Sequence, residues 1–439
     1  MTTDTAPAPG TKRALGRKAG WNLVDQAISS LGSAVSAFLI ARAVGAEEFG
    51  VFGICFAILN FLVGVHRALG SQAYAIRYSL ARSGDDPRRA GDCLAVALAT
   101  AAIAAPLIIG GAFLMDGRSQ ILALIIFAAL QPFLLMQDAV RSTLLAQGRP
   151  RDASFNDALT TAVQVAGGAT AAALGAGIDT MIAVWCTGAI VGSAAGFRQL
   201  HALPRPGRLR GWLRDVGPVG YPLLGEWAAL AGSAQVAFLG IGAIAGVAAL
   251  GSIRAAQTLL GPLGTFGLAV TAFAVPHLSA HPQSARSARR FGLLISGMLA
   301  LVDLVWGGVL LVLPDSVGTT LLGASWSGAQ VVLLPLLIQQ VAIALTVGPN
   351  TLLAALSQTA RSFKLAVVHG LLLAALGLLG ALLLDVRAAT YGFALASTLV
   401  VPVAWWQLTR GAAGGSTLAS DERTGDEFVP HHEIHEGDR

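Results

Sequence analysis

Residues 32–40 read GSAVSAFLI, and residues 232–240 read GSAQVAFLG, which is nearly the same nonapeptide 200 positions later. At this single offset the match extends backwards to Gly20 and Leu23, and eight positions between residues 20 and 39 are identical to their counterparts. Both copies lie in long apolar runs. We therefore interpret the match as one membrane helix that occurs once in each half of a duplicated chain.

The composition indicates a membrane protein. The 439 residues are 54% hydrophobic and only 12% charged, whereas a soluble chain is roughly 25% charged. The cysteines Cys55, Cys93 and Cys186 lie in or beside apolar runs, with neither a disulfide framework nor metal-ligand spacing. The net charge of +5 does not indicate a nucleic-acid partner, because the basic residues gather in short loops between apolar runs.

Twelve apolar stretches are each close to the roughly 20 residues that a spanning helix needs. Several contain an internal proline, which neighbouring membrane helices tolerate. The first stretch is too long for a cleaved signal peptide, and eleven more follow it. The expected spans are 21–41, 50–69, 93–114, 120–137, 156–175, 180–199, 217–244, 250–274, 290–313, 329–350, 364–384 and 389–409.

The basic residues of the loops predict the orientation. One alternating set of segments holds 22 basic residues near helix ends, and the other set holds only Arg42, Arg118 and Arg387. Basic residues concentrate on the cytoplasmic side of membrane proteins. Both termini are therefore expected in the cytoplasm, and the alternation supports the count of twelve spans.

A second echo supports duplication, because the TLLA at 143–146 recurs at 351–354, and a basic stretch follows each copy. The two nonapeptides are six predicted helices apart, so they run in the same direction, as in parallel repeats.

The basic stretch between the halves could lie along the headgroups as a short amphipathic segment. The predicted units are a basic cytoplasmic N-terminus (1–19), an N-lobe (20–200), a linker (201–216), a C-lobe (217–410) and a disordered cytoplasmic tail (411–439).

Two cations stand out in the apolar stretches, where a central charge costs roughly 2.5–3.5 kcal/mol on insertion scales. Arg254 lies near the outer end of its helix, the side on which the positive-inside rule disfavours it. Arg67 lies near a cytoplasmic helix end, where it either contacts substrate or serves as a snorkelling anchor. Both are candidates for binding an anionic substrate.

Acidic and amide side chains give further candidates. Asp25 and Glu226 lie at nearly equivalent positions of the two copies, either as interfacial carboxylates or as coupling and gating groups. Asp303 lies well inside an apolar run, where a polar neighbour could pair with it. Gln235 and Gln257 are polar candidates for an internal cavity, although interhelical hydrogen bonds are a common role for such residues.

Motifs for other chemistry are weak. The sequence has no HExxH, GxSxG or phosphate-binding loop, so we expect no enzyme. The HHEIH of residues 431–435 fits a solvated tail better than a metal site. Two overlapping GxxxG motifs, Gly188-Gly192-Gly196, fit close packing within one lobe better than a dimer face.

Four stretches together resemble the polysaccharide flippases of the multidrug/oligosaccharidyl-lipid/polysaccharide exporter superfamily. The resemblance spans roughly residues 20–410, and its motifs are loose patterns of Gly, Arg and Pro in apolar context. The four stretches are ARAVGAEEFGVFGICFAIL (41–59), QDAVRSTLLAQGRPRDASFNDAL (137–159), AALGSIRAAQTLLGPLG (248–264) and VGTTLLGASWSGA (317–329).

The resemblance implies two six-helix lobes around a central cavity that opens alternately to each side of a bacterial cytoplasmic membrane. It implies transport of undecaprenyl-pyrophosphate-linked sugars, whose charged head must cross about 30 Å of hydrocarbon. Arg254 or Arg67 would pair with the pyrophosphate. No cofactor is expected beyond a coupling proton or sodium ion. The expected partners are the lipid-linked glycan, membrane lipids, and glycosyltransferases and a polymerase of the same pathway.

Three alternatives remain open from the sequence. A multidrug/cation antiporter of the same superfamily would use an acidic residue in the first helix, for which Asp25 is available. A membrane-embedded glycan polymerase or ligase would carry catalytic groups in a large outer loop, and the longest outer loop here, about 314–328, has one acid and no histidine. A non-catalytic scaffold would not need polar positions inside its spans.

Overall fold

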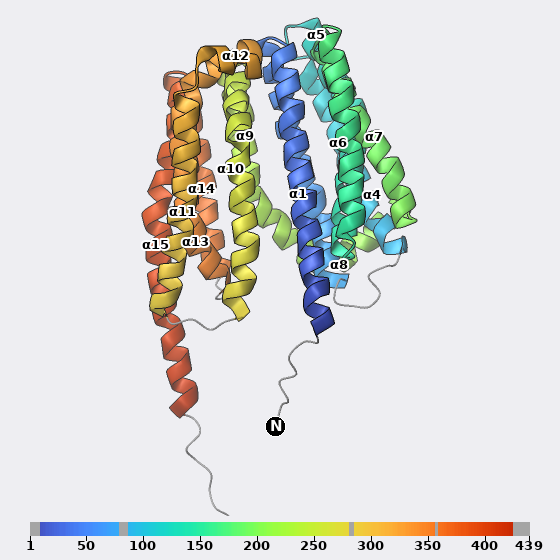
Figure 1. Cartoon of the computed structure of the whole chain (residues 1–439). Helices are drawn as coiled ribbons and strands as arrows, with labels where there is room; N and C mark the ends of the chain where they lie inside the picture. Colours follow the sequence, from blue (N-terminus) through green and yellow to red (C-terminus); the bar gives the residue numbers. More distant parts are fainter. Residues whose placement is uncertain (1–8, 79–86, 281–284, 356–358, 425–439) are drawn as a thin grey trace, which may run out of the picture.

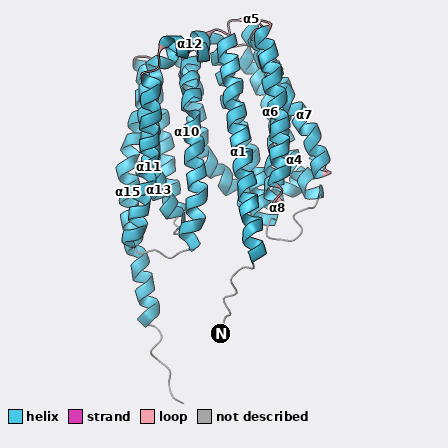
Figure 2. Cartoon of the chain, in the orientation of Figure 1, coloured by secondary structure: helices cyan, strands magenta, loops and turns pink. Residues whose placement is uncertain are grey.

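The computed structural model describes residues 9–78, 87–280, 285–355 and 359–424. These residues form helices joined by short loops, and no strand occurs among them (Figure 2). The prediction of an all-α membrane protein is confirmed. Long runs of Ala, Leu, Val and Ile favour this outcome, because a helix satisfies its own backbone hydrogen bonds within lipid.

The helices form two lobes that stand side by side (Figure 1). In each lobe the helices pack mainly on members of the same lobe, and the pairings correspond in chain order, with α5 on α7 in one and α13 on α15 in the other. The N-lobe comprises α1 (Pro9–Ala43), α2 (Ala46–His66), α3 (Gln72–Tyr78), α4 (Pro87–Ala112), α5 (Arg118–Ala146), α6 (Pro150–Ala173) and α7 (Ile178–Leu200). The C-lobe comprises α9 (Ser233–Ala245), α10 (Val247–Ala280), α11 (Ala285–Leu311), α12 (Asp315–Leu322), α13 (Trp326–Ala355), α14 (Thr359–Leu383) and α15 (Val386–Thr424).

Nine helical segments of the described chain are long and apolar enough to cross a membrane. Three expected spans, 156–175, 217–244 and 250–274, are not among them. The first corresponds to α6, which carries Asp157, Thr160, Thr161 and Gln164, and the second is divided by the π-helical turn η3 (Ala228–Gly232). The third corresponds to α10, which carries Arg254 and Gln257. All three contribute to the polar interior described below, and the count of twelve spans stays a prediction.

The lobes touch tightly near the end of the bundle at which α12 lies, here called the α12 end (Figure 1). A Cβ atom added at Gly50 of α2 would lie 2.0 Å from the Val247 carbonyl oxygen of α10. A Cβ atom at Gly251 would lie 2.2 Å from the Ala46 carbonyl oxygen. Only glycine permits this approach of the two backbones, so this pair of glycines closes the lobes together at the α12 end.

The linker between the lobes packs on the N-lobe. It forms the short turn η2 (Pro206–Arg208) and then continues directly into α8 (Leu209–Trp227). Trp212 is buried, and its indole N–H donates to the Leu69 carbonyl oxygen over 2.9 Å. Asp215 accepts a hydrogen bond from Arg77 at 2.7 Å. Trp212 and Val216 are buried against the N-lobe while Leu203 is exposed, and the placement of this segment along the lipid headgroups stays a prediction.

Two terminal boundaries differ from the sequence prediction. Helix α1 already begins at Pro9, inside the expected N-terminal segment, and α15 continues to Thr424, past the expected start of the tail at 411. Residues 425–439, with the HHEIH stretch, lie outside the described residues. The start of α1 and the end of α15 lie at the end of the bundle opposite α12, here called the terminal end (Figure 1).

The glycines of the GxxxG motifs in α7 pack inside the N-lobe. Cβ atoms added at Gly188 and Gly192 would meet Thr160 of α6, and one at Gly196 would meet Val140 of α5. These close contacts are between helices of the same lobe. They confirm the interpretation that the motif serves packing within one lobe.

Candidate functional site

A polar cavity of about 670 Å³ lies between the lobes. Its walls come from α1 and α2 of the N-lobe and from α10 of the C-lobe, and the hydroxyl groups of Ser30 and Thr265 meet across it at 3.1 Å. It lies on the terminal side of the Gly50–Gly251 contact. The polar side chains in its lining are Gln26, Ser29, Ser30, Ser33, Asn60, Arg254, Gln257, Thr258 and Thr265.

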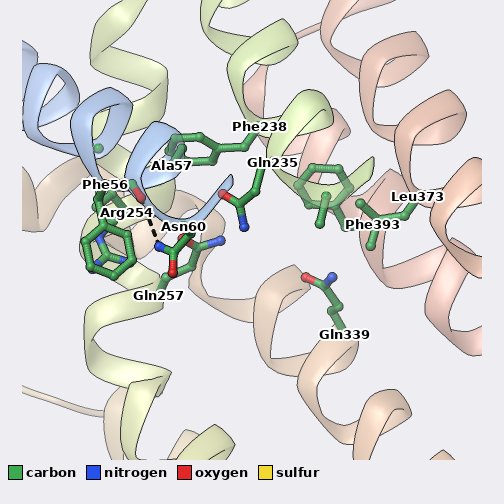
Figure 3. Close-up of a pocket in the computed structure, with 12 residues that line it drawn as sticks. Phe56, Ala57, Asn60, Gln235, Phe238, Arg254, Gln257, Gln339, Leu373 and Phe393 are labelled. Atoms are coloured by element: carbon green, nitrogen blue, oxygen red, sulfur yellow. Dashed lines mark hydrogen bonds between the residues drawn. The ribbon is translucent and has the colours of Figure 1, made fainter. Parts of the chain in front are cut away.

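A smaller cavity of about 120 Å³ adjoins it on the C-lobe side (Figure 3). Helices α2, α9, α10, α13, α14 and α15 all contribute to its lining. The two cavities have four lining residues in common, so these residues stand at the boundary between them. The shared residues are Phe56, Asn60, Arg254 and Gln257.

Among the residues that the structure describes, Arg254 is the only basic one in the lining of either cavity, and none of those residues is a carboxylate. Its guanidinium carbon lies 3.5 Å from the ring centroid of Phe56 and 5.8 Å from that of Phe52. Such cation–π contacts stabilise a cation but do not neutralise it. Within the described part of the chain Arg254 forms no ion pair, and its Nε has no hydrogen-bond partner.

The local sequence explains how an arginine fits beside the contact between the lobes. Arg254 lies one helical turn after Gly251 on α10, and its stem crosses α2 at Gly53. A Cβ atom at Gly53 would lie 3.4 Å from the Cβ of Arg254. The absent side chain at Gly53 leaves room for the arginine stem, which directs the guanidinium toward the aromatic face of Phe56.

Arg67, the second predicted cation, is neutralised by a partner inside the N-lobe. Its Nε and Nη2 donate to the two carboxylate oxygens of Asp138 at 2.8 and 2.5 Å. The His66 Nε2 lies 3.0 Å from the same carboxylate. The structure thus places Arg67 in a bidentate ion pair between α5 and the start of the π-helical turn η1 (Arg67–Ser71), and outside the linings of both cavities between the lobes.

Asp25 belongs to a second buried ion-pair cluster in the N-lobe. The Arg141 guanidinium of α5 bridges two carboxylates, with Nη2 at 2.5 Å from Asp25 of α1 and Nε at 2.8 Å from Asp157 of α6. Sequence reasoning missed Arg141 because it counted this residue among the cytoplasmic anchors. Asp25 is 116 positions from Arg141 in the sequence, so no local spacing showed that the two pair.

The remaining acidic candidates lie on α8 and α11, apart from this cluster. Glu226 lines a separate pocket of about 120 Å³ with Asn350 and His369. The His369 ring nitrogen Nε2 lies 2.9 Å from the Ser397 hydroxyl. Asp303 is buried on α11, and its Oδ2 has no hydrogen-bond partner among the described residues. The structure therefore does not bring Asp25, Glu226 and Asp303 together.

Replacing Arg141 with methionine is expected to destabilise the fold by roughly 3–5 kcal/mol, because it leaves the buried carboxylates of Asp25 and Asp157 without their cation. Thermal unfolding of the purified protein in detergent measures this. Arg149→Met is the control, since Arg149 pairs with Asp152 at the surface, where an ion pair contributes roughly 0–1 kcal/mol. Equal melting temperatures for the two variants would contradict the proposed importance of the cluster.

Comparison with known proteins gives a family and a fold. The family model described as "Polysaccharide biosynthesis protein" matches residues 39–331. No curated protein gave a significant match. Solved structures with a similar fold match it at only 13 to 14% identity and therefore inform on the fold alone.

Three solved structures illustrate the similarity. The inward-facing conformation of a multidrug resistance MATE family transporter of the MOP superfamily matches with a TM-score of 0.71 and 14% identity, over 90% of this chain and 98% of that one. An outward-facing conformation with the same description gives 0.58 and 13%, over 92% and 96%. A MOP superfamily transporter from Pyrococcus furiosus, described as having a binding pocket of reverse polarity, gives 0.59 and 13%, over 92% and 96%.

Proposed function

Because the chain belongs to the polysaccharide biosynthesis protein family, we propose that it moves an undecaprenyl-pyrophosphate-linked oligosaccharide across the bacterial cytoplasmic membrane. The observation that carries the proposal is the unpaired guanidinium of Arg254 in an otherwise neutral polar cavity between the lobes. Burying this charge without a partner is unfavourable. A pyrophosphate group of the substrate supplies the missing partner.

The cavity chemistry matches the three parts of such a substrate. Phosphate oxygens accept charge-assisted, bidentate hydrogen bonds from a guanidinium. Sugar hydroxyls both donate and accept, as do the hydroxyl and amide side chains of the larger cavity, such as Ser29, Ser33 and Asn60. The polyprenyl tail needs no polar cavity, because it stays in the hydrocarbon of the membrane.

The proposed alternating access depends on the Gly50–Gly251 contact. In this structure the contact closes the lobes at the α12 end, with the cavity on its terminal side. Release of the glycan on the outer face requires α2 and α10 to separate at these glycines. Rigid-body rocking of one lobe against the other accomplishes this separation of α2 and α10.

The proposal includes twelve spans with both termini in the cytoplasm, which makes the α12 end the outer end. A cysteine at Ser316, which is exposed on α12, is expected to react with a membrane-impermeant maleimide added to intact cells. A cysteine at the exposed Arg210 of the linker is expected to react only after the membrane is opened. The native cysteines are buried and give a low background. Reaction of both engineered cysteines in intact cells would contradict this orientation.

The antiporter alternative receives no support from the site. An organic cation needs an acidic partner in the cavity, yet neither Asp nor Glu occurs among the described residues that line the two cavities. Asp25, the residue that kept this alternative open, is paired with Arg141. Ethidium efflux and glycan export, measured in cells that lack their own transporters, separate the two functions. We expect restored export without efflux, and efflux without export would overturn the proposal.

A further inference from the structure

The smaller cavity carries three glutamine side chains from three different helices. Gln235 comes from α9, Gln257 from α10 and Gln339 from α13, and Figure 3 shows their amides around the same opening. Within the described part of the chain, the structure shows no hydrogen bond from any of the three amides to protein. All three side chains are half-buried, and each amide offers two donors and one acceptor oxygen at the cavity. The cavity is therefore built to hydrogen-bond a guest.

Aromatic rings form the other walls of this cavity. Phe56, Phe238 and Phe393 come from α2, α9 and α15. Binding pockets typically combine apolar and aromatic walls with a few placed polar groups. A pyranose ring matches this combination, because its C–H faces lie against aromatic rings while its hydroxyl groups point outward to the amides. Apart from Arg254, which the phosphate would occupy, the described residues of the lining include no charged side chain and no histidine, which favours a neutral sugar.

The volume suits a single sugar ring. The minimum space for one water molecule is roughly 10–15 Å³, so a cavity of about 120 Å³ accepts a guest much larger than water. A hexose has about a dozen non-hydrogen atoms. The larger cavity, at about 670 Å³, has room for several more sugars.

The position of the smaller cavity beside Arg254 indicates which sugar of the glycan would bind in it. Arg254 and Gln257 line both cavities, so a phosphate bound at Arg254 lies at the boundary between them. The first sugar is covalently attached to that phosphate. We propose that the smaller cavity binds the neutral, phosphate-attached sugar of the lipid-linked glycan, and that Gln235 and Gln339 select it. This inference rests on the proposed function.

Binding to the purified full-length protein in nanodiscs tests the proposal. The probes are undecaprenyl pyrophosphate alone and the same lipid carrying glucose or N-acetylglucosamine. A neutral hydrogen bond contributes roughly 0.5–1.5 kcal/mol, or about two- to tenfold in affinity. Wild-type protein is expected to bind at least one sugar-bearing lipid more tightly than the bare lipid, and Gln235→Met and Gln339→Met are each expected to lower that preference about two- to tenfold.

The controls separate this subsite from the phosphate site. Gln340→Met changes the neighbouring residue of α13, which lines neither cavity, and it is expected to keep the sugar preference. The glutamine variants are expected to bind the bare lipid like wild type, which also shows that they are folded. Equal binding of bare and sugar-bearing lipids by wild type, or equal weakening of both by Gln235→Met and Gln339→Met, would overturn the subsite. Failure of wild type to bind any of these lipids would overturn the proposed function and the subsite with it.

Discussion

Replacing Arg254 with alanine is expected to lower glycan export roughly ten- to hundredfold, because hydrogen bonds to charged groups contribute roughly 1.5–3 kcal/mol each. Arg254→Lys is expected to keep part of the activity, since it preserves the charge but loses the planar fork that binds two phosphate oxygens. The measurement is export of the mature glycan in cells whose own flippase has been deleted, with the amount of membrane-inserted protein determined for each variant.

A matched control for this experiment is Arg387→Ala. Arg387 also lies over an aromatic ring, with its guanidinium carbon 5.9 Å from the Tyr391 centroid, but it lines neither cavity between the lobes. Export by Arg387→Ala is expected to remain close to wild type. If Arg254→Ala exported as well as wild type at equal protein levels, the guanidinium would have only a packing role against Phe56.

Replacing Gly251 with alanine is expected to prevent closure at the α12 end and to abolish most export. The new Cβ atom would lie 2.2 Å from a backbone oxygen of α2, so the backbones must separate. Overpacking of this kind costs roughly 1–3 kcal/mol. That energy shifts the balance between the two conformations roughly five- to hundredfold toward the state that is open at the α12 end.

A cysteine at Ser33 in the larger cavity reports this shift. In the wild-type background its reaction with an impermeant maleimide added outside intact cells is expected to be slow, and in the Gly251→Ala background fast. Gly267→Ala is the control on the same helix, because a Cβ atom there meets nothing within 4 Å. Unchanged labelling and export in Gly251→Ala would show that this contact does not control access to the cavity.

The repeat and the hydropathy pattern predicted much of the architecture. The first nonapeptide lies in α1 and the second runs from the end of η3 into α9; α1 and α9 occupy corresponding places in the two lobes and pack on α6 and α14 respectively. Apolar runs reveal spanning helices because lipid demands them. The same reasoning was weakest for α6, α8 and α10, since helices that face a polar interior lose part of their apolar signal. Superposition of the two halves stays a prediction.

The site was predictable only in part, because the sequence does not show which charges are paired. Arg254 stood out because the positive-inside rule disfavours a cation near the outer end of a span, and the structure places this residue in the cavity wall. Arg67 looked similar in sequence, but its partner Asp138 is 71 positions away. The partners of Asp25 were equally hidden, since Arg141 resembled a loop anchor. Gln339 was one of several glutamines in the spans, and only packing distinguishes it from Gln340 as a cavity residue.

Transport by the purified protein in liposomes tests the central claim most directly. The liposomes carry undecaprenyl-pyrophosphate-linked oligosaccharide with a fluorescent label on the sugar, and an impermeant quencher reports how fast the labelled heads cross the bilayer. Wild-type protein is expected to move the heads much faster than protein-free liposomes do, and Arg254→Ala is expected to bring the rate close to that of the protein-free control. Crossing no faster than in protein-free liposomes, from a folded wild-type protein that does transport ethidium, would contradict the claim that the cavity carries a lipid-linked glycan.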